Sequence, residues 1–131
     1  MIGYSPQFPL KIDSEIGAYA VTKTLKQVAK QNFMNLMLTS PGERVMDARF
    51  GVGLRQYLFE PASNSLAFDI GNRIRSQVER YLPFIEINEV LFNTTDVGMT
   101  ESPDQVLNIH VEFSLPALSM TESILISSNT L

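Results

Sequence analysis

The stretch over residues 38–61, which reads LTSPGERVMDARFGVGLRQYLFEP, constrains the fold of this chain more than any other. Pro41-Gly42 predicts a turn, and Gly51 and Gly53 predict a backbone with φ values that are closed to other residues. A proline at position 61 ends the segment, because proline lacks a backbone donor and clashes with a continuing helix. A segment with so many constraints is expected to pack against something specific, either its own core or another protein.

Amphipathic helices are predicted on both sides of this segment. Apolar residues at spacings of three and four predict the first helix over residues 19–38. The second helix begins with Ser63, Asn64 or Ser65 as its N-cap and ends near Tyr81, because Pro83 follows. Its predicted inner stripe consists of Leu66, Ala67, Ile70, Ile74, Val78 and Tyr81, and its opposite face carries Arg73, Gln77 and Arg80.

The last third of the chain changes from helical spacing to alternation. Residues 85–92 predict a strand, and residues 93–104 (NTTDVGMTESPD) are dense in turn formers. Apolar residues then alternate with polar ones from Leu107 to Leu115, which is the strongest strand signal in the chain. Residues 120–128 predict a further strand. The first two strands make a hairpin with a long loop, and the third fits an edge of the sheet.

These elements predict an α+β fold, in which two amphipathic helices pack on a small, mostly antiparallel sheet of three to four strands. A length of 131 residues fits one domain over residues 1–131. Residues 1–18 predict an extended N-terminal arm with a short strand over residues 10–13, and residues 119–131 predict the C-terminal strand and tail. Tyr4, Phe8 and Leu10 of the arm either anchor it on a partner or fold back onto the domain.

Composition excludes several classes of partner. The net charge of −4 and the pI near 4.9 argue against nucleic acid, which selects a basic surface. No apolar run approaches the 18 or so residues of a membrane span, so no membrane partner is expected. The absence of cysteine excludes disulfides and thiolate metal sites. The N-terminus shows no signal-peptide pattern, so we expect an intracellular site of synthesis.

Catalytic patterns are sparse. His110 is the only histidine, and the alternation places it on the polar face of its strand. The pair Gly51 and Gly53 lacks the further glycine and lysine of a phosphate-binding loop. No serine lies in a nucleophile elbow, and one histidine is too few for a zinc site. We therefore expect no catalytic residues, no metal and no cofactor.

Carboxylates offer one further route to catalysis, because two acids suffice for glycoside hydrolysis. Glu43, Asp47 and Glu60 lie in the 38–61 stretch, each with an arginine nearby in the sequence (Arg44, Arg49 or Arg55). A general acid needs a raised pKa, whereas ion pairs with these arginines would lower it. The residues therefore favour structural salt bridges over an enzyme.

The same stretch resembles the signature of the contractile-tail baseplate wedge family, and we call residues 38–61 the signature segment. This family comprises the sheath-initiator wedge subunit of contractile-tailed phages, relatives in type VI secretion baseplates and a stress-response anti-adaptor. Some members carry a lysozyme-like label. The matching positions are Thr39, Gly42, Glu43, Arg44, Phe50, Gly51, Leu54, Leu58, Phe59 and Glu60. One departure follows the second helix, where Tyr81-Leu82-Pro83-Phe84 stands in place of the Tyr-Glu-Pro-Arg of many members.

The resemblance implies a structural, non-enzymatic subunit of a virion tail baseplate. Its partners would be other baseplate wedge proteins, the tail sheath protein and the tail tube, with multiple copies around the tail axis. It would nucleate the first sheath ring by exchanged strands. A peptidoglycan-cleaving enzyme and an anti-adaptor or secretion-system relative remain alternatives. The departure at Pro83 implies that contact with the wedge core is apolar, rebuilt elsewhere or absent.

Residue roles follow as expectations. Phe50, Leu54, Leu58 and Phe59 are expected to lock the signature segment to the helices, and Gly51 to hold its backbone. Two of these roles have an alternative without a partner. The arginines of the second helix would also be explained by a helix face in solvent, and the apolar residues over 123–128 by a strand inside the sheet. The candidate partner-binding residues are Glu43, Arg44, Asp47, Glu60, Arg73, Arg80, Pro83, Phe84, Ile124, Leu125 and Ile126.

Overall fold

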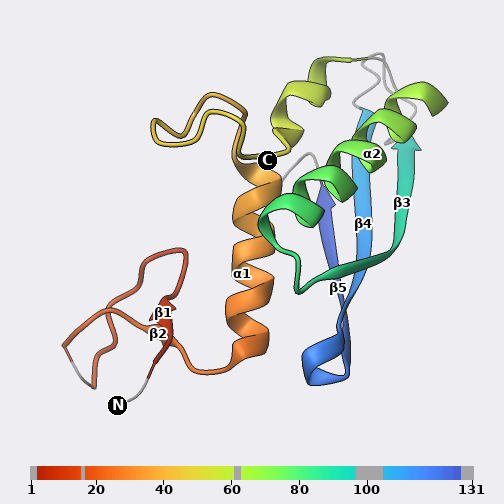
Figure 1. Cartoon of the computed structure of the whole chain (residues 1–131). Coiled ribbons are helices and arrows are strands. Elements are labelled where there is room, and N and C mark those ends of the chain that lie inside the picture. The colour runs from red at the N-terminus through yellow and green to blue at the C-terminus, as the bar shows by residue number, and fades with distance from the viewer. Residues whose placement is uncertain (1–2, 16, 61–62, 97–104, 128–131) are drawn as a thin grey trace. The chain divides into compact units, whose positions relative to one another are not determined.

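A computed structural model describes residues 3–15, 17–60, 63–96 and 105–127 of the chain (Figure 1). It contains two α-helices, a two-stranded sheet and a three-stranded sheet, both antiparallel, which confirms the predicted α+β class. The elements are β1 (Ser5–Pro6), β2 (Val21–Thr22), α1 (Leu25–Leu38), the 3-10 helix η1 (Leu54–Phe59), α2 (Asn64–Tyr81), β3 (Glu86–Asp96), β4 (Gln105–Leu115), the 3-10 helix η2 (Pro116–Leu118) and β5 (Met120–Ser127).

The chain divides into two compact units, Met1–Asn35 and Leu36–Leu131. Each is described by itself below. The single domain over residues 1–131 stays a prediction.

The first unit contains a hairpin where an extended arm was predicted. β1 pairs with β2 in the register Ser5 with Thr22, and the N–H of Tyr4 donates to the carbonyl of Thr22 at 2.9 Å. The strand predicted over residues 10–13 is a single bridge between Ile12 and Tyr19. The side chain of Gln31 ties the hairpin to α1, because it donates to the carbonyl of Pro6 and accepts from the N–H of Phe8.

The helix α1 ends at Leu38 as predicted, but it begins at Leu25 and not at residue 19. A capping box sets this start: the N–H of Gln27 donates to Oγ1 of Thr24 at 3.2 Å, and Oε1 of Gln27 accepts from the N–H of Thr24 at 3.3 Å. The preceding Val21 and Thr22 are β-branched and fit the strand β2 better than a helix. The apolar spacing had concealed this boundary.

The second unit contains the three-stranded sheet, in the order β3-β4-β5. β4 is the central strand, and its side chains alternate as predicted: Ile109, Val111, Phe113 and Leu115 are buried, while His110 lies on the other face. β5 is at an edge, as the sequence indicated. β3 extends to Asp96, into the stretch predicted as a turn, because residues 93–96 continue the ladder opposite residues 105–108 of β4.

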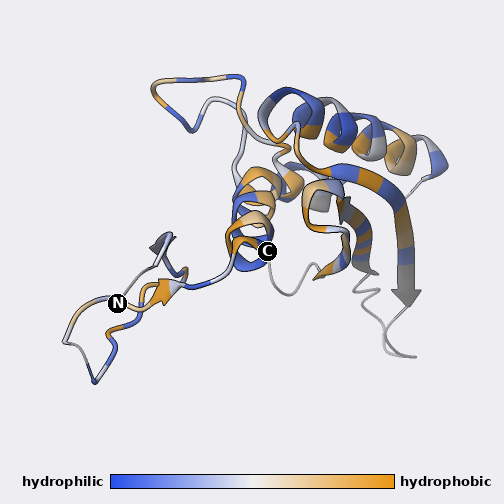
Figure 2. Cartoon of the chain, turned by 60° about the horizontal axis from the view of Figure 1, so that its bottom comes forward, coloured by the Kyte–Doolittle hydropathy of each residue, from blue (hydrophilic) through white to orange (hydrophobic). Residues whose placement is uncertain are grey.

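The helix α2 lies across one face of this sheet (Figure 1). Its N-cap is Ser63, whose Oγ accepts from the N–H of Leu66 at 3.2 Å, and it ends at Tyr81 as predicted. Hydrophobic residues gather on one side of α2 and hydrophilic ones on the other (Figure 2). Its buried residues are Leu66, Ile70, Gly71, Ile74 and Val78. In the described part of the chain, neither helix is both long and apolar enough to cross a membrane.

Two neighbouring residues of β5 provide a test of the sheet register. Ile126 is buried and Leu125 is 65% exposed. We expect Ile126→Ala to lower the free energy of unfolding by about 2–5 kcal/mol, because it removes buried methyl groups and leaves a cavity. The matched control Leu125→Ala should change it by less than about 0.5 kcal/mol. Chemical denaturation measures both. The opposite ranking would mean that β5 is shifted by one residue.

Candidate interaction surface

The signature segment leaves the end of α1, forms a loop and returns to the helix. The N–H of Gly42 donates to the carbonyl of Ala48 at 2.8 Å and closes the 42–48 loop, which projects from the ribbon (Figure 1). The N–H groups of Val52 and Gly53 then donate to the carbonyls of Leu36 and Thr39, both at 3.0 Å. The carbonyl of Leu36 in the last turn of α1 and that of Thr39 just after it therefore have partners, where a helix end otherwise leaves carbonyls unsatisfied.

Glycine is required where the segment returns. Gly51 has φ +112° and Gly53 has φ +70°, which confirms the backbone predicted from the sequence. A Cβ at Gly51 would overlap the carbonyl oxygen of Thr39 and lie 2.8 Å from its carbonyl carbon. At Gly53 it would lie 2.7 Å from Cδ of Pro41. The close approach of two backbone segments leaves no room for a side chain.

Polar residues of α2 bind the backbone of the signature segment. Nε of Arg73 donates to the carbonyl of Val52 at 3.1 Å, and Nη2 reaches the carbonyl of Gly51 at 3.4 Å. The amide of Gln77 accepts from the N–H of Gly51 at 3.0 Å and donates to the carbonyl of Arg49 at 3.1 Å. The sequence placed Arg73 and Gln77 on the face away from the core, and their spacing of one helical turn was the available signal for this shared role.

The end of α2 contacts the 42–48 loop at Asp47. The hydroxyl of Tyr81 donates to Oδ2 of Asp47 at 2.7 Å, and the N–H of Arg49 donates to Oδ1 at 3.0 Å. The rings of Phe50 and Tyr81 meet edge to face, with centroids 5.0 Å apart. The guanidinium of Arg44 stacks 3.8 Å from the centroid of Phe50 on the same cluster.

This contact shifts the pKa of both groups. The hydrogen bond from Tyr81 is the main cause that lowers the pKa of Asp47, followed by the N–H of Arg49, with smaller effects of the charges of Arg80 and Arg44. The same bond raises the pKa of Tyr81. The sequence suggested a lowered carboxylate pKa through arginine pairs, whereas the largest cause is a tyrosine 34 positions away.

Other residues of the signature segment have separate positions. Oε2 of Glu43 accepts from the N–H of Ser40 at 2.8 Å and closes the turn at Pro41-Gly42. Phe50 and Leu54 are buried, and the contact of Phe50 with Tyr81 is the expected lock to the second helix. Glu60 is exposed. The side chains of Leu58 and Phe59 lie outside the described residues.

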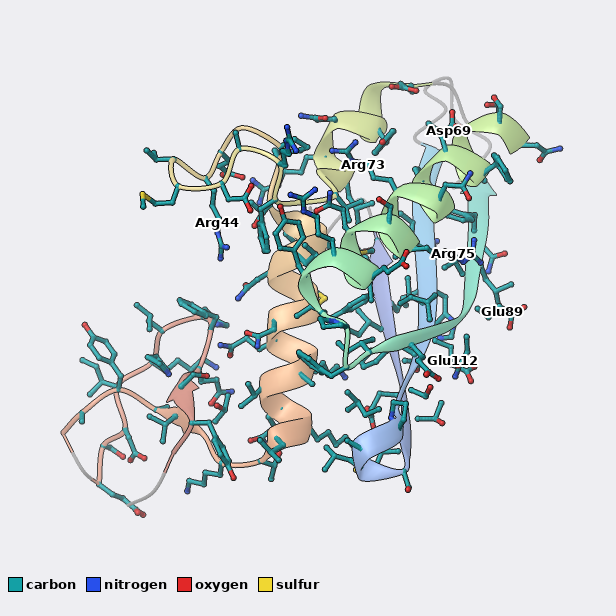
Figure 3. All side chains as sticks on the ribbon, viewed as in Figure 1. Arg44, Asp69, Arg73, Arg75, Glu89 and Glu112 are labelled. Atoms are coloured by element: carbon teal, nitrogen blue, oxygen red, sulfur yellow. The ribbon has the colours of Figure 1, made fainter. Side chains whose placement is uncertain are left out.

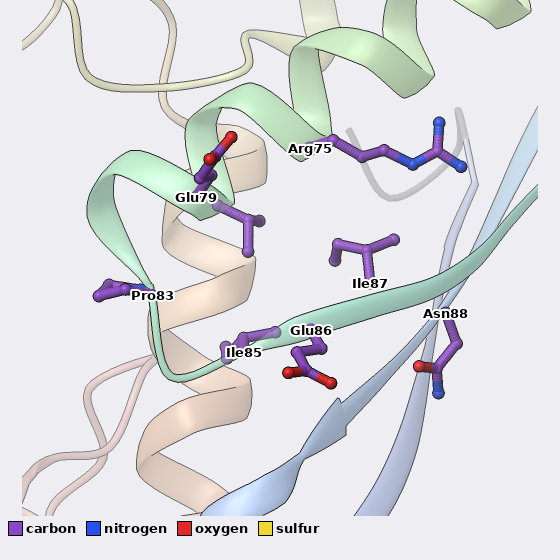
Figure 4. Close-up of a pocket in the computed structure, with 8 residues that line it drawn as sticks. Arg75, Glu79, Pro83, Ile85, Glu86, Ile87 and Asn88 are labelled. Carbon is purple, nitrogen blue, oxygen red and sulfur yellow. The ribbon is translucent and has the colours of Figure 1, made fainter.

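A groove runs between α2 and β3 on the other side of α2. Figure 3 labels Arg73 and Arg75; Arg73 reaches the signature segment, and Arg75 lines this groove. One cavity of about 530 Å³ is lined by Arg75, Val78, Glu79, Pro83, Ile85, Glu86, Ile87 and Asn88 (Figure 4). A second cavity of about 300 Å³, which we call the apolar cavity, is lined by Ala67, Phe68, Gly71, Arg75, Val90 and Phe92.

The structure separates the predicted partner-binding residues. Pro83 lines the larger cavity, and Phe84 beside it is 47% exposed. Of the three residues proposed on β5, Ile124 and Ile126 are buried and only Leu125 presents its side chain. Arg80 lies at the end of α2 near the ring of Tyr81. In the described residues, no group of histidines and carboxylates could hold a metal ion.

Comparison with known proteins gives a family and a fold. The family model described as "Baseplate wedge protein gp25" matches residues 23–118. A structure described as a "putative tail lysozyme" from Geobacter sulfurreducens has a TM-score of 0.65 and 19% identity, covering 82% of this chain and 93% of that one. A chain of the baseplate of the anti-feeding prophage, 6-fold symmetrised, has a TM-score of 0.58 and 20% identity, covering 97% and 85%. No curated protein matches this sequence.

Replacement of Gly51 tests the close backbone approach. We expect Gly51→Ala to lower the free energy of unfolding by more than about 2 kcal/mol, because the new Cβ meets the Thr39 carbonyl at a φ that L residues rarely adopt. Gly71→Ala is the matched control: its Cβ would lie 3.7 Å from the nearest atom, so helix propensity should leave it neutral or up to about 1 kcal/mol more stable. Equal stabilities would contradict the account of Gly51.

The bond between Tyr81 and Asp47 predicts a pH dependence. Tyr81→Phe should lower the free energy of unfolding, with the full difference from wild type between pH 3.8 and 10.0, the ordinary pKa values of the two groups. The stabilisation by Asp47, whose pKa is lowered, is lost as pH falls through its folded pKa. The stabilisation by Tyr81, whose pKa is raised, is lost as pH rises through the folded pKa of Tyr81. Denaturation across this range measures the difference, with Tyr19→Phe as control. A difference independent of pH would exclude this bond as its source.

Proposed function

The chain belongs to the family of the baseplate wedge protein gp25, and we propose from this premise that it is a structural subunit of a contractile-tail baseplate that nucleates the tail sheath. The family match spans both helices, β3, β4 and the signature segment. Its place would be the virion tail baseplate after synthesis in the host cytoplasm. The anti-feeding prophage baseplate, which contains a chain of this fold, is 6-fold symmetrised, and this supports several copies around a tail axis here.

The observation that carries sheath nucleation is the edge strand β5. In the described sheet β5 has β4 as its neighbour on one side, and residues 123–127 (SILIS) carry no charge. Soluble proteins usually guard such an edge with charges, prolines or a covering segment. An uncharged, β-prone edge suits an incoming strand, whose backbone groups extend the ladder. We therefore propose that β5 accepts a strand of the first sheath subunits, with Leu125 on its exposed face.

Contacts with other wedge proteins are proposed through two regions. One is the signature segment, where Glu43, Arg44, Asp47 and Glu60 lie near the surface. The other is the turn after α2, where Pro83 borders a cavity and Phe84 is half exposed. Leu82 and Phe84 flank Pro83 in place of the family's charged pair; Leu82 is buried, so we propose that Phe84 makes an apolar contact with the wedge core. The tail tube is a further proposed neighbour.

A structural role is favoured over hydrolysis by the chemistry of the carboxylates. A general acid needs a raised pKa, whereas the pKa of Asp47 is lowered. Glu43 holds the turn at Ser40 through its own carboxylate. The likeness to a protein described as a tail lysozyme, at 19% identity, concerns the fold. We therefore propose that this chain is not an enzyme.

Charges placed on β5 test sheath nucleation. Deletion of residues 123–131 is unsuitable, because Ile124 and Ile126 belong to the core. The double variant Ser123→Lys, Leu125→Lys alters exposed positions only, and we expect it to fold but to reduce sheath initiation at least about tenfold, since lysine blunts an edge strand. Electron microscopy of assembled tails counts baseplates with and without sheath.

The matched control adds the same charge elsewhere. Asn72→Lys, Ser76→Lys changes two exposed residues of α2 and should leave sheath initiation unchanged. Thermal unfolding verifies that both double variants are folded. Normal sheaths with the β5 variant would contradict strand acceptance, whereas normal sheaths in tails that lack this protein would contradict the baseplate role itself.

A further inference from the structure

The tip of the 42–48 loop presents two apolar side chains to solvent. Val45 is 97% exposed and Met46 is 96% exposed, the highest values among the large apolar residues of the described chain. The charged residues around them each have a contact within the protein, although Glu43 and Arg44 stay exposed. Glu43 binds the N–H of Ser40, Asp47 binds Tyr81, and Arg44 stacks on Phe50. The tip therefore exposes two large apolar side chains, a group that folded proteins mostly bury, whereas the charged residues beside them have contacts within the protein.

The loop is also held in one shape. The hydrogen bond from the N–H of Gly42 to the carbonyl of Ala48 joins the two ends of the loop, and the hydrogen bond from Tyr81 to Asp47 attaches the loop to α2. A loop fixed before binding loses less conformational entropy when a partner covers it. Val and Met side chains each contribute about 1.5–3 kcal/mol when fully buried, and Met adapts to irregular pockets. The tip is therefore suited to insertion into an apolar pocket.

The same chain carries such a pocket. Five of the six residues around the apolar cavity are uncharged: Ala67, Phe68, Gly71, Val90 and Phe92. It is an open hollow of about 300 Å³ between α2 and β3. Phe68 at its rim is 68% exposed, so the cavity is bordered by apolar surface that has no cover in the described chain. The loop tip and the cavity thus match in chemistry.

One copy of the chain cannot bring them together. The loop is attached to the row of α2 that contains Arg73, Gln77 and Tyr81. The apolar cavity is lined by the row that contains Gly71 and Arg75. Rows two residues apart lie roughly 200° apart around a helix of 3.6 residues per turn, so they face nearly opposite directions. A knob on one side and a hole on the other define a head-to-tail contact, which closes into a ring when the rotation allows.

We propose that Val45 and Met46 of one copy insert into the apolar cavity of a second copy of this chain. The 42–48 loop carries Glu43, Arg44 and Asp47, and its carboxylates are bound within the protein, so the contact needs no charged partner surface such as nucleic acid or an anionic membrane. This contact rests on the proposed function in one respect: copies arranged around a tail axis would be neighbours. The interaction itself belongs to the isolated chain and can be tested there.

Disulfide trapping tests this contact, because the chain has no cysteine of its own. A tagged Met46→Cys variant is mixed with an untagged Ala67→Cys variant at high concentration under mild oxidation. We expect mixed dimers to form about tenfold faster than with the control partner Ser76→Cys, which is exposed elsewhere on α2, because docking raises the effective concentration of the two thiols. Adding Val45→Glu to the tagged chain should remove the difference. Thermal unfolding verifies that every variant is folded.

Equal rates with Ala67→Cys and Ser76→Cys would overturn the proposal, and so would trapping that is insensitive to Val45→Glu. Preferential capture of Met46→Cys by another baseplate protein or by vesicles would also overturn it, since the tip would then serve a different partner. The two proposals can fail separately. If trapping is unselective but sheath assembly still requires this protein, the contact between copies is wrong and the baseplate role stands. If trapping is selective but sheath assembly does not require this protein, the baseplate role is wrong and the contact between copies stands.

Discussion

The close approach of the backbone at Gly51 to the carbonyl of Thr39 is the constraint on which the signature segment depends. It returns the chain to the end of α1 after the 42–48 loop, and it exposes the N–H of Gly51 and the carbonyls of Gly51 and Val52 toward α2. Gln77 and Arg73 then bind these groups. A side chain at position 51 would separate the two backbones, and the donors and acceptors of α2 would lose their partners together. Turn, loop and helix contact therefore form one unit.

α2 serves different purposes on its different faces. Its buried stripe packs within the core, the row of Arg73 and Gln77 binds backbone, and the row of Gly71 and Arg75 borders the groove beside β3. Long polar side chains on a helix are often read as solvent-facing, yet here two of them satisfy buried or half-buried peptide groups. This explains how an 18-residue helix can organise a segment that has little regular structure of its own.

The sequence predicted the elements whose signals are local. Alternation identified β4, proline and serine bounded α2, and glycine spacing indicated the left-handed backbone at Gly51. The start of α1 was wrong because apolar spacing continued through Val21, while the capping box at Thr24 decided the boundary. Contacts across long separations were not predictable: nothing near Asp47 indicates that Tyr81 binds it, and nothing near Val45 indicates that its side chain is left almost fully exposed. The residues that bind a partner could not be predicted either, because their roles depend on the partner's surface, which lies outside this chain.

The outward tip of the 42–48 loop has a consequence for how this protein can change over time. The atoms that fold the loop belong to Gly42, Glu43, Asp47 and Tyr81, whereas the atoms at its tip belong to Val45 and Met46 and contact nothing in the described structure that would hold them. Substitutions at the tip leave the isolated fold intact, because surface positions of this kind contribute little to stability. The proposed contact can therefore be altered at two positions without disturbing the residues that fold the loop.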